Sequence, residues 1–158
     1  MAVQVSVCGP AQCGDELRML AYEVGRLLAV RGAVVICGGY GGVMAAVAAG
    51  ARSRDGLVVG VLSGGDRNGG GPDLSVAIAT GLGQARNSVI VNSGDAVIVI
   101  GGSWGTLTEL AMAARRATVP VVQLGRGWSV TDEDGKPLPG VVRARTAEEA
   151  VRLTGLWP

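Results

Sequence analysis

Residues 96–116 read AVIVIGGSWGTLTELAMAARR. The five apolar residues 96–100 predict a strand buried on both faces of a parallel sheet, and the alanine-rich segment 106–116 predicts the helix that follows it. A strand, a glycine turn and a helix start bring backbone N–H groups to one point, where the helix dipole also favours negative charge. The stretch therefore predicts an α/β fold with an anion site at this turn, and it leaves the role of Glu109 open.

The same alternation of strand and helix patterns extends along the whole chain. Apolar runs predict further strands, and helical spacing of apolar residues predicts further helices. The strands are expected at 3–8, 33–37, 57–62, 76–79 and 120–124, and the helices at 17–28, 43–51 and 85–92. Residues 128–143 predict a hairpin excursion after the last parallel strand, and Thr146 opens a final helix with a capping box. This order predicts a doubly wound, Rossmann-like α/β domain with a mostly parallel sheet and helices on both faces.

Length and composition predict a single domain over residues 1–158. A chain of 158 residues with 48% apolar residues can bury a full core but is short for two ordinary domains. No apolar run reaches the roughly 18 residues that a membrane span needs, and the first residues lack the pattern of a secretory signal. We therefore expect a cytoplasmic protein with no membrane partner.

Charge and missing residue types exclude several kinds of partner and chemistry. The net charge is +1 and the arginines are dispersed, which gives no basis for binding nucleic acid. The chain has no histidine, so a Ser-His-Asp triad and histidine-ligated metals are excluded, and we assign no metal site. The single lysine, Lys136, follows a predicted hairpin turn at Asp134-Gly135, which excludes a P-loop and argues against a Schiff base. A phosphorylated small molecule is the favoured partner.

Three cysteines, Cys8, Cys13 and Cys37, give no disulfide framework, because their number is odd and no export signal precedes them. Cys8 and Cys37 end apolar strands, so we expect them to be small buried thiols. Metal binding or redox chemistry is the alternative role.

Glycine is concentrated in the loops that follow strands. These loops read CGPAQCG (8–14), GGYGG (38–42), SGGDRNGGGP (63–72) and GGSWG (101–105). Because the carboxyl ends of parallel strands share one edge of the sheet, the four loops are expected to converge there on a ligand. The loop at 63–72 has no apolar residue and is a candidate lid. Ordinary turn glycines are the alternative explanation.

The loop at 38–42 predicts a backbone cradle for an oxyanion rather than a dinucleotide site, because the pattern G-x-G-x-x-G fails at Met44. The ligand-binding residues that we expect on this edge are mostly glycines from two loops and a helix start. They are Gly9, Gly38, Gly39, Gly41, Gly42, Arg86, Gly101, Gly102, Ser103, Trp104, Gly105, Thr106 and Glu109.

GGYGGVMAAVAAGA (38–51), the arginine in TGLGQARNSV (80–89) and GGSWGTLTEL (101–110) resemble segments of the LOG (Lonely Guy) superfamily, which includes proteins labelled possible lysine decarboxylases. The stretch 80–124 is most similar to the molybdenum cofactor carrier branch. The resemblance implies a homo-oligomer, a dimer or tetramer, that binds molybdenum cofactor or a nucleoside monophosphate and needs no cofactor to fold. A lysine decarboxylase is not expected, because the only lysine is Lys136.

The resemblance also implies an alternative function, because LOG enzymes hydrolyse the N-glycosidic bond of nucleoside 5′-monophosphates. Carried onto this chain, their catalytic glutamate is Glu109 and their arginine is Arg86. A carboxylate can stabilise an oxocarbenium-like ribose, and an arginine can clamp a phosphate. The chain departs from the enzyme pattern at its turn, which begins with Gly101 where the enzymes have proline. It also has Asn87 after the arginine, and the resemblance therefore favours binding over hydrolysis.

Local alternatives remain for four of these residues. Thr106 and Glu109 have the spacing of a capping box, which would hold the glutamate at its own helix start. Arg86 could form a surface salt bridge, and Trp104 could either stack on a planar ligand or close the turn against the core.

The segments 43–51 and 110–114 have almost no polar residues, so a second copy of the chain is expected to cover them.

Overall fold

The computed structural model describes residues 1–137 and 139–158. Within them, strands and helices alternate in the order that the sequence predicts. Their bounds are β1 Gln4–Cys8, α1 Asp15–Val30, β2 Val34–Cys37, α2 Val43–Arg52, β3 Val58–Leu62, β4 Val76–Ala79, η1 Gly83–Ala85 (a 3₁₀ turn), α3 Arg86–Ser93, β5 Ala96–Ile100, α4 Trp104–Arg116, β6 Val121–Leu124, β7 Val142–Ala144 and α5 Ala147–Leu153. No helix in these residues is both long and apolar enough to cross a membrane.

The strands form one parallel sheet in the order β4-β3-β2-β1-β5-β6-β7. The chain winds outward from β1 to β4 and then returns to place β5 on the other side of β1. The direction of winding therefore changes between β1 and β5, where doubly wound folds bind their ligands at the carboxyl ends of the strands. The predicted fold class is confirmed.

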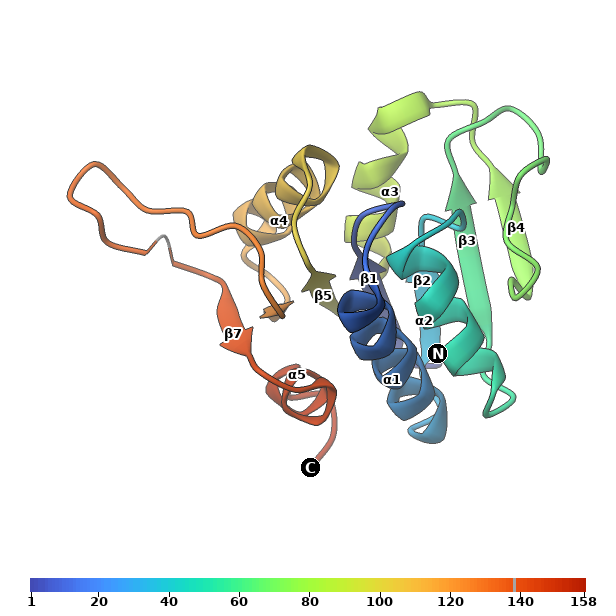
Figure 1. Cartoon of the computed structure of the whole chain (residues 1–158), viewed down its shortest axis with the longest axis horizontal. Coiled ribbons are helices and arrows are strands. Elements are labelled where there is room, and N and C mark those ends of the chain that lie inside the picture. The colour runs from blue at the N-terminus through green and yellow to red at the C-terminus, as the bar shows by residue number, and fades with distance from the viewer. Residues whose placement is uncertain (138) are drawn as a thin grey trace.

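Helices cover both faces of this sheet (Figure 1). On one face, α1, α2 and α5 pack over a core that includes Val5 and Val35. On the other face, α3 and α4 pack over a second core that includes Ile90 and Leu110. All five residues of β5 are buried, as the apolar run at 96–100 predicts, because this strand lies inside the sheet and is covered on both faces.

Two glycines allow α1 and α2 to touch backbone to backbone. A Cβ atom on Gly25 of α1 would collide with the carbonyl oxygen of Val47, and one on Gly50 of α2 would collide with that of Tyr22. The apolar surface of α2 is therefore covered largely by α1 of the same chain. This contact leaves less of α2 for a second copy of the chain to cover, and the expected homo-oligomer stays a prediction.

The segment after β6 differs from its prediction in one respect. Residues 125–137 and 139–141 project from the body of the protein, shown in orange in Figure 1, and we call these residues the excursion. Its tip has the predicted turn, in which the N–H of Gly135 donates to the carbonyl oxygen of Asp132 at 3.1 Å, and Thr131 bridges Pro137 in antiparallel fashion. However, the chain then forms β7 parallel to β6. The strand at 120–124 is thus not the last one.

We expect Gly50→Ala to lower the free energy of unfolding by about 3 kcal/mol or more, because the new methyl group meets backbone atoms that cannot rotate away. Urea unfolding measures the change. Gly65→Ala is the matched control, since a Cβ atom there has no neighbour within 4 Å among the described residues and should change stability by less than about 0.5 kcal/mol. Equal effects of the two substitutions would contradict the assigned helix contact.

Candidate functional site

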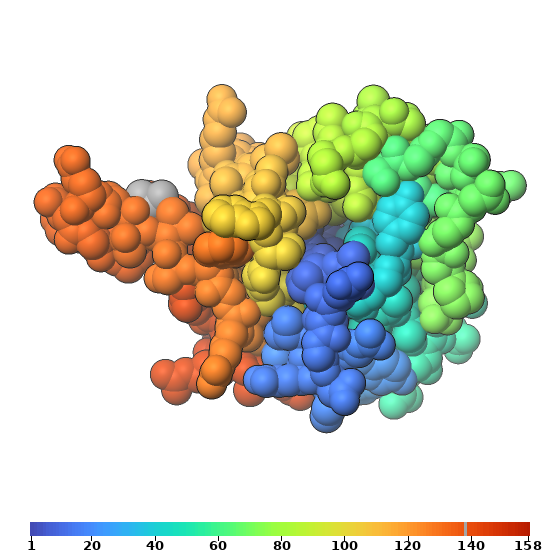
Figure 2. All heavy atoms as spheres, turned by 45° about the horizontal axis from the view of Figure 1, so that its top comes forward, coloured from blue at the N-terminus to red at the C-terminus, as the bar shows by residue number. Residues whose placement is uncertain are grey.

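The loops after β1, β2, β3 and β5 lie along one edge of the sheet, as their glycine content predicts. The N–H of Val43 donates to the carbonyl oxygen of Pro10 at 3.0 Å, and the N–H of Gly71 donates to that of Gly39 at 2.8 Å. Figure 2 brings this edge forward, with the blue, cyan, green and yellow loops on one side of the molecule. We call the edge formed by residues 9–14, 38–42, 63–72 and 101–106 the glycine rim.

The expected binding residues of the glycine rim differ in their access to solvent. Gly41, Gly102, Trp104 and Gly105 are exposed, and Gly9 and Ser103 are partly exposed. Several of the others are buried. These are Gly38, Gly39, Gly42, Gly101 and Thr106. In addition, the Pro10 carbonyl already accepts the first N–H of α2, so the predicted cradle at 38–42 is partly filled by the chain itself.

The start of α4 is the part of the rim best arranged to receive an anion. The hydroxyl of Ser103 caps this helix by accepting the N–H of Thr106 at 3.2 Å. The N–H groups of Trp104 and Gly105 have no hydrogen-bond partner among residues 1–137 and 139–158. They are therefore free donors at the positive end of a helix of 13 residues.

The predicted capping box of Thr106 and Glu109 is wrong. The helix begins two residues earlier than predicted, at Trp104, and the capping residue is Ser103. The carbonyl oxygen of Ser103 also accepts the indole N–H of Trp128 at 2.9 Å, which fixes the turn from the excursion. Glu109 thus lies in the second turn of α4, free of a capping role.

Two close approaches explain glycines at this turn. A Cβ atom on Gly9 would lie 2.8 Å from the carbonyl oxygen of Ile100, at the crevice between β1 and β5. Gly101 has a φ of +73°, a conformation that other residues rarely adopt, and a Cβ atom there would lie 2.6 Å from Leu17. Both glycines bring the ends of β1 and β5 close to α1 and α2.

Arg86, the first residue of α3, is buried and reaches across the ends of two strands. Its Nη1 donates to the carbonyl oxygens of Gly38 and Val61 at 2.7 and 2.5 Å, and its guanidinium carbon lies 5.6 Å from the centre of the Tyr40 ring. Its Nε is buried and has no hydrogen-bond partner among the described residues. A surface salt bridge, the alternative for Arg86, is therefore excluded. The guanidinium is a structural clamp with one buried nitrogen, Nε, still unpaired among the described residues.

Glu109 is buried close to Arg86 and to the thiol of Cys8. Burial raises the pKa of Glu109 from 4.5 to about 7, although the charge of Arg86 and a hydrogen bond from Cys8 lower it. Glu109 and Arg86 form no ion pair within 4.0 Å in the described part of the chain. Burial, with the nearby carboxyl of Glu109, raises the pKa of Cys8 well above its ordinary value, and burial raises that of Cys37 to about 11. Both cysteines are thus buried neutral thiols, as predicted.

Trp104 does not close the turn against the core. It is 76% exposed, and its ring centre lies 4.9 Å from that of Trp128 at an angle of 37°. Because the indole of Trp128 is hydrogen-bonded to Ser103, the pair forms an aromatic surface beside the free N–H groups of α4.

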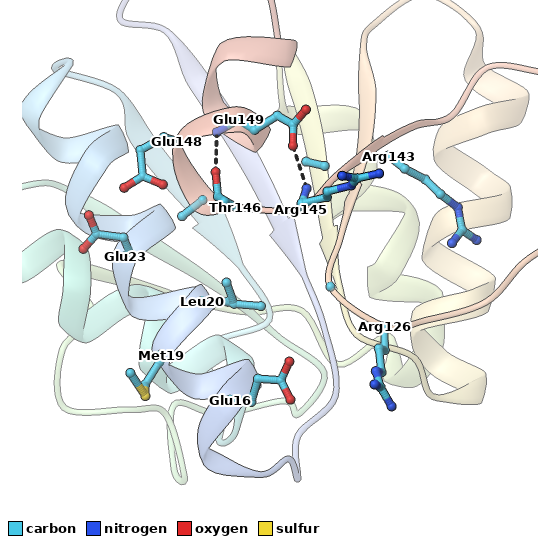
Figure 3. A pocket seen from close by; sticks show the side chains of 13 residues that line it. Glu16, Met19, Leu20, Glu23, Arg126, Arg143, Arg145, Thr146, Glu148 and Glu149 are labelled. Atoms are coloured by element: carbon cyan, nitrogen blue, oxygen red, sulfur yellow. Dashed lines mark hydrogen bonds between the residues drawn. The ribbon is translucent and has the colours of Figure 1, made fainter.

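A further cavity, of about 960 Å³, contains none of the predicted site residues. It is lined by α1, by the ends of β6 and β7 and by α5. In Figure 3, Glu16 on α1 lies opposite Arg126, which follows β6, whereas Glu23 points away from it and forms an ion pair with Arg26. The cavity has no sequence signal of its own, because the residues that form β7 predict a hairpin instead of a parallel strand. The carboxyl ends of parallel strands share one edge of the sheet, where ligands bind, and the same rule applied to β6 and β7 locates this cavity.

These features define the class of protein: a doubly wound α/β protein whose candidate binding edge lies at the switch between β1 and β5. The chain belongs to the SLOG cluster4 family, which matches residues 2–151, and the resemblance to the LOG superfamily is thereby confirmed. A protein of Archaeoglobus fulgidus, described only as uncharacterized, is 45% identical over 118 residues, which cover 72% of this chain and 74% of that protein.

Two solved structures with the same fold bind or carry molybdenum cofactor according to their descriptions. The molybdenum cofactor binding protein of the phototrophic bacterium Rippkaea orientalis has a TM-score of 0.87 and 32% identity, over 97% of this chain and 95% of that one. The molybdenum cofactor carrier protein of Chlamydomonas reinhardtii has a TM-score of 0.81 and 26% identity, over 96% and 95% of the two chains. The similarity therefore extends over nearly the whole length of each protein.

The raised pKa of Glu109 predicts that its contribution to stability falls as the pH rises. Between pH 4.5 and about 7 the native state holds a proton that the unfolded state releases, so the free energy of unfolding decreases through this range. The difference in pKa corresponds to about 3 kcal/mol. We therefore expect Glu109→Gln to match the wild type at about pH 5 and to exceed its stability by up to about 3 kcal/mol at about pH 8. Urea unfolding at both pH values measures this, and an equal difference at the two would contradict it.

Proposed function

We propose that this protein binds a phosphate-bearing, nucleotide-like ligand at the glycine rim and serves as a molybdenum cofactor carrier. The observation that carries the proposal is the start of α4, where two backbone N–H groups without partners in the described residues stand exposed beside the Trp104–Trp128 surface. The similarity to proteins that are described as binding or carrying molybdenum cofactor supports the choice of cargo.

Each part of the edge has a distinct task in this proposal. The N–H groups of Trp104 and Gly105 donate to the phosphate, and the helix dipole adds a favourable field. The exposed face of Trp104 stacks against the planar ring system of the ligand. The buried charge of Arg86 makes the potential around the strand ends more positive without direct contact. Below a pH of about 7, Glu109 is protonated and adds no negative charge to oppose the ligand.

Nucleoside monophosphate hydrolysis remains the alternative. One observation favours it, because a carboxyl group with a pKa of about 7 is suited to acid–base chemistry at neutral pH. One observation disfavours it, because Nη1 of Arg86 is already held by the carbonyl oxygens of Gly38 and Val61. An arginine held in this way has less freedom to clamp a phosphate, so binding is the preferred function.

Two substitutions at one position test the anion site. Trp104 is the first residue of α4, where proline is tolerated, and Ser103 before it has the extended backbone that proline requires. Trp104→Pro removes the indole and the N–H, whereas Trp104→Ala removes the indole alone. A hydrogen bond to a charged group contributes about 1.5–3 kcal/mol, so the proline variant should bind inorganic phosphate at least about tenfold more weakly than the alanine variant. Isothermal titration calorimetry measures both affinities.

The same variants separate binding from hydrolysis. With AMP and with a molybdopterin-type ligand, the wild type should bind more tightly than Trp104→Ala, because these ligands have a ring that can stack. Equal phosphate affinities of the proline and alanine variants would reject the anion site. Release of free base from a nucleoside monophosphate, abolished in Glu109→Gln, would establish the hydrolase in place of the carrier.

We also propose that the protein is a homo-oligomer in which a second copy covers the outer side of α4. A groove of about 470 Å³ on this side is lined by Trp104, Leu107, Ala111 and Met112, among others. An exposed apolar groove of this kind is typical of a protein–protein contact.

Met112→Glu should therefore shift the mass measured by light scattering to that of the 15.9 kDa monomer, because it places a charge in the apolar contact. Met19→Glu is the matched control: Met19 is more exposed, lies on α1 and should leave the mass unchanged. A wild-type protein that is already monomeric would overturn this proposal.

A further inference from the structure

The hydroxyl group of Tyr40 lies among several hydrogen-bond donors of the turn at the end of β3. The backbone N–H groups of Ser63 and Gly64 donate to its oxygen at 3.1 and 3.2 Å, and the Ser63 hydroxyl lies 3.2 Å away. This turn opens the 63–72 segment of the glycine rim. It is separated from the start of α4, because β2 and β1 lie between β3 and β5 in the sheet.

Two successive backbone N–H groups that converge on one oxygen form a concavity suited to anions. A neutral phenol accepts weaker hydrogen bonds than an anionic oxygen does. An anion in its place would therefore form stronger hydrogen bonds with the donors of this turn. The same donors, the Ser63 hydroxyl first, lower the pKa of Tyr40, and they do so against the opposing effect of burial. The turn thus stabilises negative charge on the oxygen that it holds.

The guanidinium of Arg86 places a positive charge over the Tyr40 ring. Its guanidinium carbon lies 5.6 Å from the ring centre, and its buried Nε has no hydrogen-bond partner in residues 1–137 and 139–158. The side chain is only 8% exposed, so this unpaired donor is not compensated by bulk water. Rotation of Tyr40 away from the turn would leave two N–H groups and a hydroxyl without their partner, in a turn whose occupant lies beside a buried cation.

We propose that the Ser63–Gly64 turn is a second anion subsite. The Tyr40 hydroxyl occupies this subsite when no ligand is bound. A phosphate or another oxyanionic group of the ligand displaces the phenol and takes its donors. This inference rests on the proposed function only in assigning both anionic groups to one ligand. Three strand spacings separate β3 from β5, so such a ligand would have anionic groups about 14 Å apart.

Displacement of Tyr40 would also change how the 63–72 segment is held. At its start the segment is attached to Tyr40, and near its end the N–H of Gly71 donates to the carbonyl oxygen of Gly39 at 2.8 Å. Loss of the first attachment leaves the second, so the segment can adjust around the incoming group while its far end stays in place. The candidate lid is therefore docked on the 38–42 loop at both ends in the absence of ligand.

The test compares phosphate binding in Tyr40→Ala and the wild type. The wild type must break the hydrogen bonds of Tyr40 before an anion can enter, whereas the alanine variant has no such cost. We expect Tyr40→Ala to bind inorganic phosphate at the turn about tenfold more tightly, which corresponds to about one or two hydrogen bonds. Isothermal titration calorimetry measures the affinity, and the amide resonances of Ser63 and Gly64 should shift during the titration.

Control variants distinguish the two anion sites and guard against misfolding. Tyr22→Ala removes the other tyrosine, which lies on α1, and should leave phosphate affinity unchanged. Tyr40→Phe retains the ring and should show a smaller gain than Tyr40→Ala. The double variant Tyr40→Ala with Trp104→Pro should still shift the Ser63 and Gly64 resonances, even if the α4 site proves wrong. Unchanged or weaker phosphate binding in both folded Tyr40 variants, without those shifts, would overturn the second subsite.

Discussion

The hydrogen bonds of the Arg86 guanidinium hold together the strand ends on which the glycine rim depends. One nitrogen, Nη1, donates to the carbonyl oxygens of Gly38, which follows β2, and of Val61, which lies in β3. The first residue of α3 is thereby tied to a loop and to a strand that are 48 and 25 residues away in the sequence. A planar guanidinium suits this task, because its donors point in fixed directions, whereas a lysine would supply a flexible point charge.

The charge balance of the rim follows from the burial of this cation and of Glu109. Neither side chain is neutralised by a close ion pair in the described residues. The charge of each therefore contributes to the electrostatic potential at the strand ends. Burial favours the neutral form of Glu109 and thereby reduces the negative charge at the rim, while Arg86 stays charged. The rim, with the start of α4, is thus more favourable to an anion than the net charge of +1 would suggest.

Local patterns in the sequence were sufficient for most of the fold. The apolar run at 96–100 coincides with β5, because a buried parallel strand requires apolar residues on both faces. β7 was missed, because its residues, Val142 to Ala144, form no apolar run and two of the three are exposed. The edge of the sheet that gathers the glycine loops followed from topology alone.

The details of the site were less accessible, since they depend on contacts between distant residues. Ser103 and Thr106 both have hydroxyl groups at positions where they could cap the helix. Ser103 is the residue that caps it, and its carbonyl oxygen also accepts a hydrogen bond from Trp128 of the excursion. Burial of Arg86 likewise depends on carbonyl oxygens from other strands. The role of Tyr40 had no sequence signal, because its partners lie more than 20 residues further along the chain.

The excursion also gives the protein an unusual chemical property. Lys136, the only lysine of the chain, is exposed near the tip of this projecting segment, with its N–H bonded to Asp132. Apart from the N-terminal amine, a reagent specific for amines therefore finds a single side chain, on the segment that projects from the body in Figure 1. A fluorophore or an immobilisation tether can be attached there at one defined point, leaving the rest of the surface unmodified.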